Sequence, residues 1–261
     1  MTDFTSAVPP HRDTAPIRRA AAATTVVVFA GGQLMTSLAG PAPVADVVIA
    51  ADSGLDQARR LGYDVDLVVG DLDSVSPAAL AAAEASGIPV ERHPVAKDAT
   101  DLELALDAAL AHGADEIVVI GGYGGRVDHF LAGALALTRD QCAGVTVRAL
   151  VGPARLEVIR HAGELTGDRG ELVTLLAVRG PVSGVTTTGL LYPLQGETLH
   201  PGSTRGVSNQ LVGPVATVRV TSGVLLAVLP GEVGPDPNPA PESDLTPTSA
   251  SEADISPEEP R

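Results

Sequence analysis

The chain has 261 residues, enough for one large domain or two small ones, and its formal net charge of −15 excludes a basic surface for nucleic acid. Hydrophobic residues make up 44% of the chain but aromatic residues only 2%, so the core must consist of Ala, Val and Leu, as in α/β domains with buried parallel strands. A single cysteine, Cys142, excludes an internal disulfide and indicates a reducing compartment, and no apolar stretch is long enough to span a bilayer.

Strands and helices alternate regularly in the predicted first domain, residues 21–150, which follows a loose arm at residues 1–20. Its first strand, at 24–30, follows two arginines and mimics a secretory signal, but similar strands follow it, which favours a strand. Such alternation predicts a Rossmann-like parallel sheet with helices on both faces. We expect further strands at 47–51, 67–69, 89–92, 116–120 and 145–150, and helices at 55–61, 77–86, 101–112 and 127–139.

The character of the chain changes after residue 151, where helical periodicity disappears and Gly and Pro separate short Val, Leu and Thr runs. This pattern predicts a small antiparallel β-sandwich domain at residues 151–231. Residues 232–261 are acidic and proline-rich, and we expect them to form a disordered tail. The strands expected in the second domain are 155–160, 171–178, 198–199, 215–220 and 224–229.

Acidic residues follow several of the predicted strands and one helix start. The stretch "VVIAADSG" contains Asp52, "LVVGDLDS" contains Asp71 and Asp73, and "KDATD" contains Asp98 and Asp101. Because ligands bind at the carboxyl ends of parallel strands, we expect these acids to converge on one crevice. Their repulsion needs a cation, and carboxylate oxygens without nearby His or Cys favour Mg²⁺, which usually completes its coordination with substrate phosphates. This indicates a nucleotide site.

A glycine-rich turn, "GGYGG" at residues 121–125, follows another buried strand and precedes Arg126 and Asp128. Its bare amides can approach a phosphate, although the turn matches neither the Walker A loop nor GxGxxG, where Val127 replaces the last glycine. The chain has sixteen arginines but one lysine, Lys97, which lies inside "KDATD". A compact ammonium at this position is not equivalent to an arginine.

Each of these features also has a purely structural interpretation. Asp98 and Asp101 can cap a helix, and Asp71 and Asp73 can belong to a turn. Two reaction classes fit the acids: a phosphatase in which Asp71 attacks phosphate, and direct transfer from a metal-bound nucleotide without a covalent intermediate. In the phosphatases the motif normally ends the first strand and a lysine follows after a long gap, whereas here two strands precede it and Lys97 follows quickly.

Six motifs stand in order along residues 26–229: "ADSG" (51–54), "GDLDS" (70–74), "KDATDLELAL" (97–106), "GGYGGRVDH" (121–129), "TTTGLLYPL" (186–194) and "GVSNQ" (206–210). Together they resemble the thiamine pyrophosphokinase (thiamin diphosphokinase) family. The resemblance implies transfer of the pyrophosphoryl group of ATP to the hydroxyethyl oxygen of thiamine, giving thiamine diphosphate and AMP. It also implies a homodimer with thiamine sites between the α/β domain of one subunit and the β domain of the other. With the composition described above, we expect a cytoplasmic protein with no membrane or nucleic-acid partner.

The family motifs imply a role for each matching residue. Catalytic roles fall to Asp71, Asp73, Asp101 and Arg126, with the three aspartates as Mg²⁺ ligands. The ATP-binding residues implied are Asp52, Lys97, Asp98, Thr100, Gly124, Gly125 and Asp128. Ser208, Asn209 and Tyr192 are expected to contact thiamine.

The sequence departs from the family pattern at Ser53, Asp56, Gly133 and Gln210, and it contains no Trp for stacking on thiamine. Two other functions are compatible with the same fold. One is a pyrophosphokinase acting on another alcohol, such as a hydroxymethylpterin, and the other is a non-catalytic regulatory protein that resembles the enzyme. The two β-domain motifs argue against the pterin enzyme, and the acidic tail argues against a membrane-linked regulator.

Overall fold

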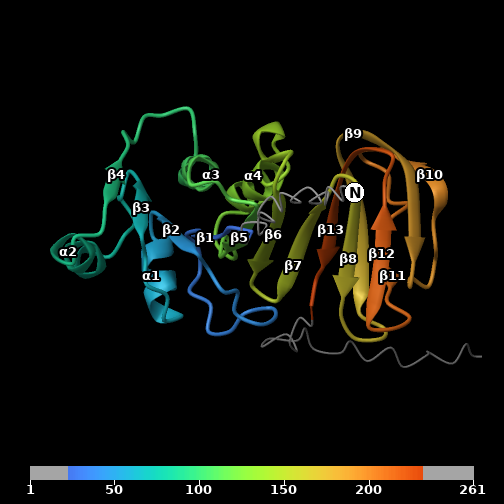
Figure 1. The fold of residues 1–261 in the computed structure, drawn as a ribbon, viewed down its shortest axis with the longest axis horizontal. Helices are drawn as coiled ribbons and strands as arrows, with labels where there is room; N and C mark the ends of the chain where they lie inside the picture. The colour runs from blue at the N-terminus through green and yellow to red at the C-terminus, as the bar shows by residue number, and fades with distance from the viewer. Residues whose placement is uncertain (1–22, 232–261) are drawn as a thin grey trace, which may run out of the picture. The chain divides into compact units, whose positions relative to one another are not determined.

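The computed structural model describes residues 23–231, so the predicted arm and the predicted acidic tail lie outside the described residues. Six strands of the first part pair in parallel in the order β4-β3-β2-β1-β5-β6 (Figure 1). Each lies within about two residues of a predicted strand. They are β1 (Thr25–Phe29), β2 (Val47–Ala51), β3 (Leu67–Gly70), β4 (Val90–Arg92), β5 (Glu116–Ile120) and β6 (Thr146–Val151).

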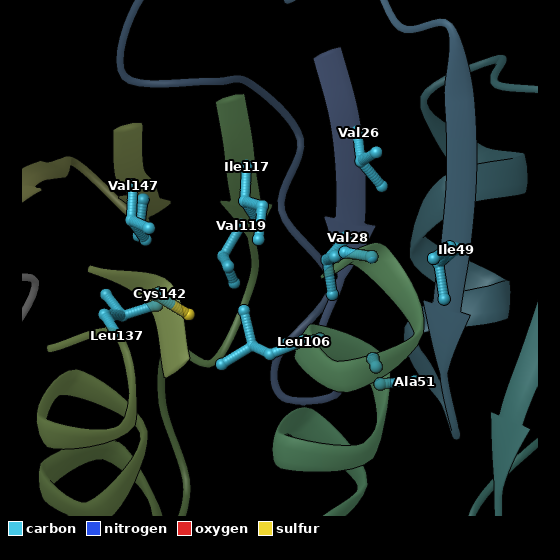
Figure 2. Packing of buried hydrophobic residues seen from close by; sticks show 14 of the residues in the cluster. Val26, Val28, Ile49, Ala51, Leu106, Ile117, Val119, Leu137, Cys142 and Val147 are labelled. Atoms are coloured by element: carbon cyan, nitrogen blue, oxygen red, sulfur yellow. The ribbon is translucent and has the colours of Figure 1, made fainter. Parts of the chain in front are cut away.

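Helices cover both faces of this parallel sheet, as predicted. Val26 and Val28 of β1 pack in one core cluster with α3, whereas Val27 and Phe29 pack in a second cluster with α1 and α2. Figure 2 shows the first of these cores, where Leu106 of α3 meets the strand residues. The helices are α1 (Gly54–Arg60), α2 (Pro77–Ala85), α3 (Asp101–Ala111) and α4 (Val127–Ala136), followed by the 3₁₀ turn η1 (Asp140–Cys142).

The second part of the chain extends the same sheet with antiparallel strands. β6 pairs with β7, β7 with β13 and β13 with β9, and a third core cluster lies between the strands of this part. The strands are β7 (Ala154–Ile159), β8 (Ala162–Thr166), β9 (Leu172–Thr188), β10 (Gln195–Leu199), β11 (Asn209–Gln210), β12 (Val215–Arg219) and β13 (Ser222–Leu229).

The prediction of a strand at 171–178 was too short, because β9 continues through Gly180 and Pro181 to Thr188. Gly and Pro normally interrupt strands, but here Arg179 and Gly180 adopt positive φ angles of 61° and 126°. The ladder to β13 shifts register beside this bend, and β9 then pairs with β10 and β12. The strands β8 and β11 were also missed, since neither contains a long apolar run.

The observed class is a mixed α/β sheet, which confirms the predicted fold class at that level. No helix among residues 23–231 is long and apolar enough to cross a membrane. The division into domains at residues 150 and 151 stays a prediction.

Gly54, the first residue of α1, brings that helix against the end of β1. A Cβ atom there would overlap the carbonyl of Phe29, 2.6 Å from its carbon. We predict that Gly54→Ala lowers the free energy of unfolding by about 2 kcal/mol, because overpacking forces the helix away from the strand. Urea denaturation measures this change.

Gly144→Ala is the matched control, because a Cβ at Gly144 meets no atom within 4 Å and its φ is not positive. This control should change stability by less than about 0.5 kcal/mol. Equal effects of the two substitutions would show that the helix does not depend on the close approach.

Candidate active site

A cleft of about 650 Å³ lies at the carboxyl ends of the parallel strands. β1 lies between β2 and β5 in the sheet, so the chain leaves β1 in one direction for β2 to β4 and returns on its other side for β5 and β6. Such a switch in strand order opens a crevice at the strand ends, where α/β proteins bind ligands. The cleft is lined by the segments after β1, β2, β3 and β5 and by the start of α3.

Three carboxylates from separate elements meet in this cleft. Asp52 follows β2, Asp71 follows β3 and Asp101 opens α3, and each offers an oxygen within 4.8 Å of the others. Two unit charges at such a distance repel by roughly 3 kcal/mol in a partly buried environment. The group is therefore unfavourable without a compensating cation.

Asp52 is the most enclosed member of the group, with 9% of its surface exposed. The hydroxyl of Ser74 donates a hydrogen bond to its Oδ2, while its Oδ1 is buried without a hydrogen-bond partner in the described structure. A buried carboxylate oxygen normally has a donor or a cation beside it. This oxygen therefore indicates a place for a ligand.

Unusual backbone geometry holds the carboxylates in place. Asp52 and Leu72 have left-handed φ angles of 48° and 64°, which are costly outside glycine and cluster at functional sites. Gly70 has a φ of 147°, and a Cβ there would lie 2.9 Å from Oδ1 of Asp101. Glycine at this position therefore lets β3 and α3 approach closely enough to share one site.

The start of α3 is fixed by a capping box. The hydroxyl of Thr100 accepts a hydrogen bond from the Glu103 amide at 3.2 Å, and the Glu103 carboxylate accepts one from the Thr100 amide at 3.2 Å. Asp101 is thus in the first helical turn, where the helix dipole favours its negative charge. Its Oδ1 also accepts a hydrogen bond from the Asp71 amide at 3.2 Å.

Lys97 bridges two of the three carboxylates. Its Nζ lies 2.7 Å from Oδ2 of Asp71 and 3.0 Å from Oδ1 of Asp101. The hydrogen bond from Lys97 holds the pKa of Asp71 below its usual range. Partial burial opposes the charge on Lys97, but the hydrogen bonds to both aspartates raise its pKa above the ordinary value.

Asp73 lines the cleft but is not one of the three carboxylates that meet. The family motifs imply Asp73 as a metal ligand, whereas the third member of the observed group is Asp52. Its amide donates a hydrogen bond to Oδ1 of Asp71 at 3.3 Å. The nearby charge of Asp71, followed by burial and the charge of Asp52, raises the pKa of Asp73. Its role as a metal ligand stays a prediction.

The glycine-rich turn after β5 forms the wall of the cleft beside the segment after β1. The Gly122 amide donates to the Gly31 carbonyl at 2.8 Å, and the Gln33 amide donates to the Tyr123 carbonyl at 2.8 Å. Gly121 admits no side chain, because a Cβ there would overlap the Ala30 carbonyl. The cleft lining includes Gly124, Gly125 and Arg126, as expected.

Two of the predicted ATP-binding residues lie outside the cleft lining. Asp98 is exposed and makes no side-chain hydrogen bond within the described residues. Asp128 pairs with Arg126 at 2.5 Å, and this pairing lowers the pKa of the carboxyl to about 2. Asp128 is therefore a partner of the cleft residue Arg126 and is not itself part of the cleft lining.

The group of three carboxylates fits a hard divalent cation. It offers oxygen donors from three elements, and one of its buried oxygens lacks a partner. Mg²⁺ prefers such oxygen ligands and retains open positions for water and phosphate. Asp52, Asp71 and Asp101 are therefore the residues that could hold an ion.

The residues expected to contact thiamine form a separate patch on the second part of the chain. The side-chain amide of Asn209 donates to the Tyr192 carbonyl at 2.7 Å, and its Oδ1 accepts from the Tyr192 amide at 3.0 Å. Asn209 is buried and its polar atoms are engaged, so it holds Tyr192 in position instead of presenting a free amide. Ser208 is exposed beside it, with a φ of 58°.

Sequence reasoning assigned no role to four polar residues of the cleft lining: Gln33, Ser53, Ser74 and His129. Ser74 and His129 lie inside motifs that were recognised, but no pattern assigned them a role. The Gly31–Gly32 pair could have indicated Gln33, because the pair follows a buried strand, as Asp52 and Asp71 do.

Two family models match the chain. The catalytic domain of thiamin pyrophosphokinase matches residues 42–147, and its vitamin B1 binding domain matches residues 160–225. The chain belongs to the thiamin pyrophosphokinase family. Both parts of the chain therefore match the family, with the catalytic domain before the vitamin B1 binding domain, as the order of the motifs predicted.

Individual relatives support the same assignment. Thiamine pyrophosphokinase of Bacillus subtilis (strain 168) is 27% identical over 209 residues, which cover 78% of this chain and 97% of that protein. A crystal structure of thiamine pyrophosphokinase from Bacillus subtilis has a TM-score of 0.71 at 26% identity and covers 80% of this chain and 100% of that chain. Thiamin pyrophosphokinase from Candida albicans, at 15% identity, shares the fold with a TM-score of 0.63 over 78% of this chain and 89% of that one.

Ser74 supplies the side-chain hydrogen bond that holds the buried Asp52 carboxylate. We predict that Ser74→Ala lowers the free energy of unfolding by about 2 kcal/mol in metal-free buffer, because it leaves a buried charge without its donor. Chemical denaturation with a chelator present measures this loss.

Ser86→Ala is the control, since the Ser86 hydroxyl donates only to the Ala82 carbonyl at an exposed helix end. Its effect should stay below about 0.5 kcal/mol. If Ser74→Ala were equally mild, Asp52 would not depend on Ser74 for its place in the site.

Proposed function

We propose that this chain is a thiamine diphosphokinase, which transfers the pyrophosphoryl group of ATP to thiamine and releases AMP. The observation that carries the proposal is the meeting of Asp52, Asp71 and Asp101 in a glycine-walled cleft at the strand ends. Family membership over both parts of the chain supports the choice of ATP and thiamine as substrates. A carboxylate cluster alone would not select them.

Different residues of the cleft would bind the metal ion and the phosphates of ATP. Asp71 and Asp101 would hold Mg²⁺ together with Asp52, and Asp73 would act on the ion or its water ligands from the same turn. The bound ion supplies neutralisation of the phosphate charge. The bare amides of Gly124 and Gly125 can donate hydrogen bonds to the polyphosphate, and Lys97 and Thr100 also belong to the cleft lining.

Arg126 is the residue best placed to meet the charge that develops during transfer. Its side chain is largely exposed, lies at the cleft and is paired with Asp128, which orients the guanidinium. A planar guanidinium binds phosphate oxygens through two parallel hydrogen bonds. Holding the thiamine hydroxyl in line with the β-phosphorus would then supply most of the acceleration, and one carboxylate would accept the hydroxyl proton.

Thiamine binding and a homodimer belong to the same proposal. Tyr192, Ser208 and Asn209 are absent from the cleft lining, so the second substrate needs a surface brought to the cleft. Helix α4, beside the cleft, has an unburied apolar stripe of Val127, Leu131 and Leu135 with 69%, 56% and 55% exposure. Such a stripe is suited to contact with a second copy, which would contribute its thiamine-binding patch.

The finer structural and cellular assignments are part of the proposal as well. We describe the first part as a Rossmann-like catalytic domain and the second as a β-sandwich domain. Their separate core clusters and the two family models support this description. A cytoplasmic location is part of the proposal, and the single free cysteine, Cys142, supports it.

Purified protein supplied with Mg²⁺, ATP and thiamine should form AMP and thiamine diphosphate in equal amounts. Anion-exchange chromatography resolves both products. Formation of ADP with thiamine monophosphate would contradict pyrophosphoryl transfer, and an equal rate with a hydroxymethylpterin would contradict the choice of acceptor.

Asp71→Asn and Asp73→Asn should each lower the turnover number at least about 100-fold, because each removes a carboxylate charge that would hold the Mg²⁺ on the phosphates. Asp64→Asn is the control, since Asp64 is an exposed carboxylate at the opposite end of β3. Full activity in Asp71→Asn or Asp73→Asn would show that the reaction does not need that carboxylate.

A further inference from the structure

Lys97 is the one lysine among 261 residues, and sixteen arginines carry the other positive side chains. It lies on the segment between β4 and α3, four residues before Asp101. Its side chain is 13% exposed, and those of Asp71 and Asp101 are 11% and 25% exposed. Lys97 is thus an enclosed cation with two carboxylate partners rather than a surface lysine.

The charges of the cleft are only partly balanced by this lysine. Asp52, Asp71 and Asp101 carry three negative charges, and Lys97 supplies one positive charge to Asp71 and Asp101. Asp52 is not among its partners and keeps its unpaired buried oxygen. The group therefore holds one cation already and still has an excess of negative charge that attracts another.

A divalent ion and the ammonium compete for the same two carboxylates. An ion bound to Asp71 and Asp101 would lie about 2.1 Å from their oxygens. Nζ of Lys97 lies 2.7 Å and 3.0 Å from those same carboxylates. The two cations would therefore lie close together, and the repulsion between them would weaken both ion pairs of Lys97.

We propose that Lys97 is a displaceable internal cation, which holds the carboxylates together in the metal-free protein and leaves them when the divalent ion enters. The inference rests on the proposed function, because it takes the carboxylates as the metal site. The freed ammonium lies in the lining of the cleft, where phosphate oxygens of the nucleotide become its new partners. A bound ion without nucleotide leaves it with no such partner.

This arrangement couples the two ligands. An ion that enters alone must break the two ion pairs of Lys97 without replacing them. When the ion enters with a polyphosphate, Lys97 exchanges its aspartate partners for phosphate oxygens. Lys97 therefore weakens binding of the free ion and favours binding of the metal–nucleotide complex. A compact ammonium suits such an exchange, because it moves as a point charge and makes no fixed bidentate contact.

The first experiment measures binding of Mn²⁺ alone to the full chain by electron paramagnetic resonance, without nucleotide. We expect Lys97→Gln to bind Mn²⁺ about tenfold more tightly than the original protein, because the competing charge is gone. Lys97→Arg keeps the charge and should show no gain in Mn²⁺ affinity, since a guanidinium still competes with the ion for the carboxylates. Arg92→Gln removes an exposed positive charge paired with Glu84 and should also leave the affinity unchanged.

Each outcome decides a different point. An affinity that is equal or weaker in Lys97→Gln overturns the displacement, and so does a gain of the same size in Lys97→Arg or Arg92→Gln. Absence of Mn²⁺ binding in all variants overturns both the displacement and the metal site. Formation of AMP by the original protein tests the proposed function separately.

A second measurement needs no variant and covers the case in which Lys97→Gln does not fold. Because Lys97 carries the only side-chain amine, acetylation of lysine detected by mass spectrometry reports on this residue alone. Mg²⁺ should accelerate its acetylation several-fold, relative to sodium chloride of equal ionic strength, as the ammonium leaves its carboxylates. A rate that does not change with Mg²⁺ would overturn the proposal.

Discussion

Repulsion among three aspartates is the constraint on which this structure depends. Asp52, Asp71 and Asp101 come from two strand ends and a helix start, and their oxygens lie within 4.8 Å of one another. Folding alone gains nothing from gathering like charges in a partly enclosed cleft, and one of the gathered oxygens has no hydrogen-bond partner among residues 23–231. A binding function explains the cost, since a divalent cation with its phosphate ligands would convert the repulsion into attraction.

The rest of the fold serves to hold these groups against their repulsion. The switch in strand order around β1 opens the crevice, and the two faces of the sheet are covered by Ala and Leu of the helices, packed against apolar strand residues. Glycine at position 70 allows Asp101 to approach the end of β3, and left-handed backbone at Asp52 aims that side chain inward. Within residues 23–231, Lys97 is the basic side chain that pairs with two of these carboxylates.

Much of the first part could be predicted from sequence, because buried parallel strands are short apolar runs and the helices between them are periodic. The carboxylate site followed from the rule that parallel strands end at one edge, but the rule could not say which aspartates touch. Asp52, and not Asp73, is the third member of the group in the metal-free structure, and left-handed torsions such as those of Asp52 and Leu72 leave no mark in composition. The bend within β9 and the buried amide of Asn209 were missed for a similar reason, since both depend on partners distant in the chain.

The central claim is that one divalent ion bridges these aspartates and the phosphates of a nucleotide. The most direct test is a crystal structure of the protein with Mn²⁺ and a non-hydrolysable ATP analogue, with data collected for anomalous scattering. The account predicts an anomalous peak about 2.1 Å from oxygens of at least two of the three aspartates and in contact with the phosphates. A peak at another place, with Lys97 still bridging Asp71 and Asp101 beside bound nucleotide, would contradict it.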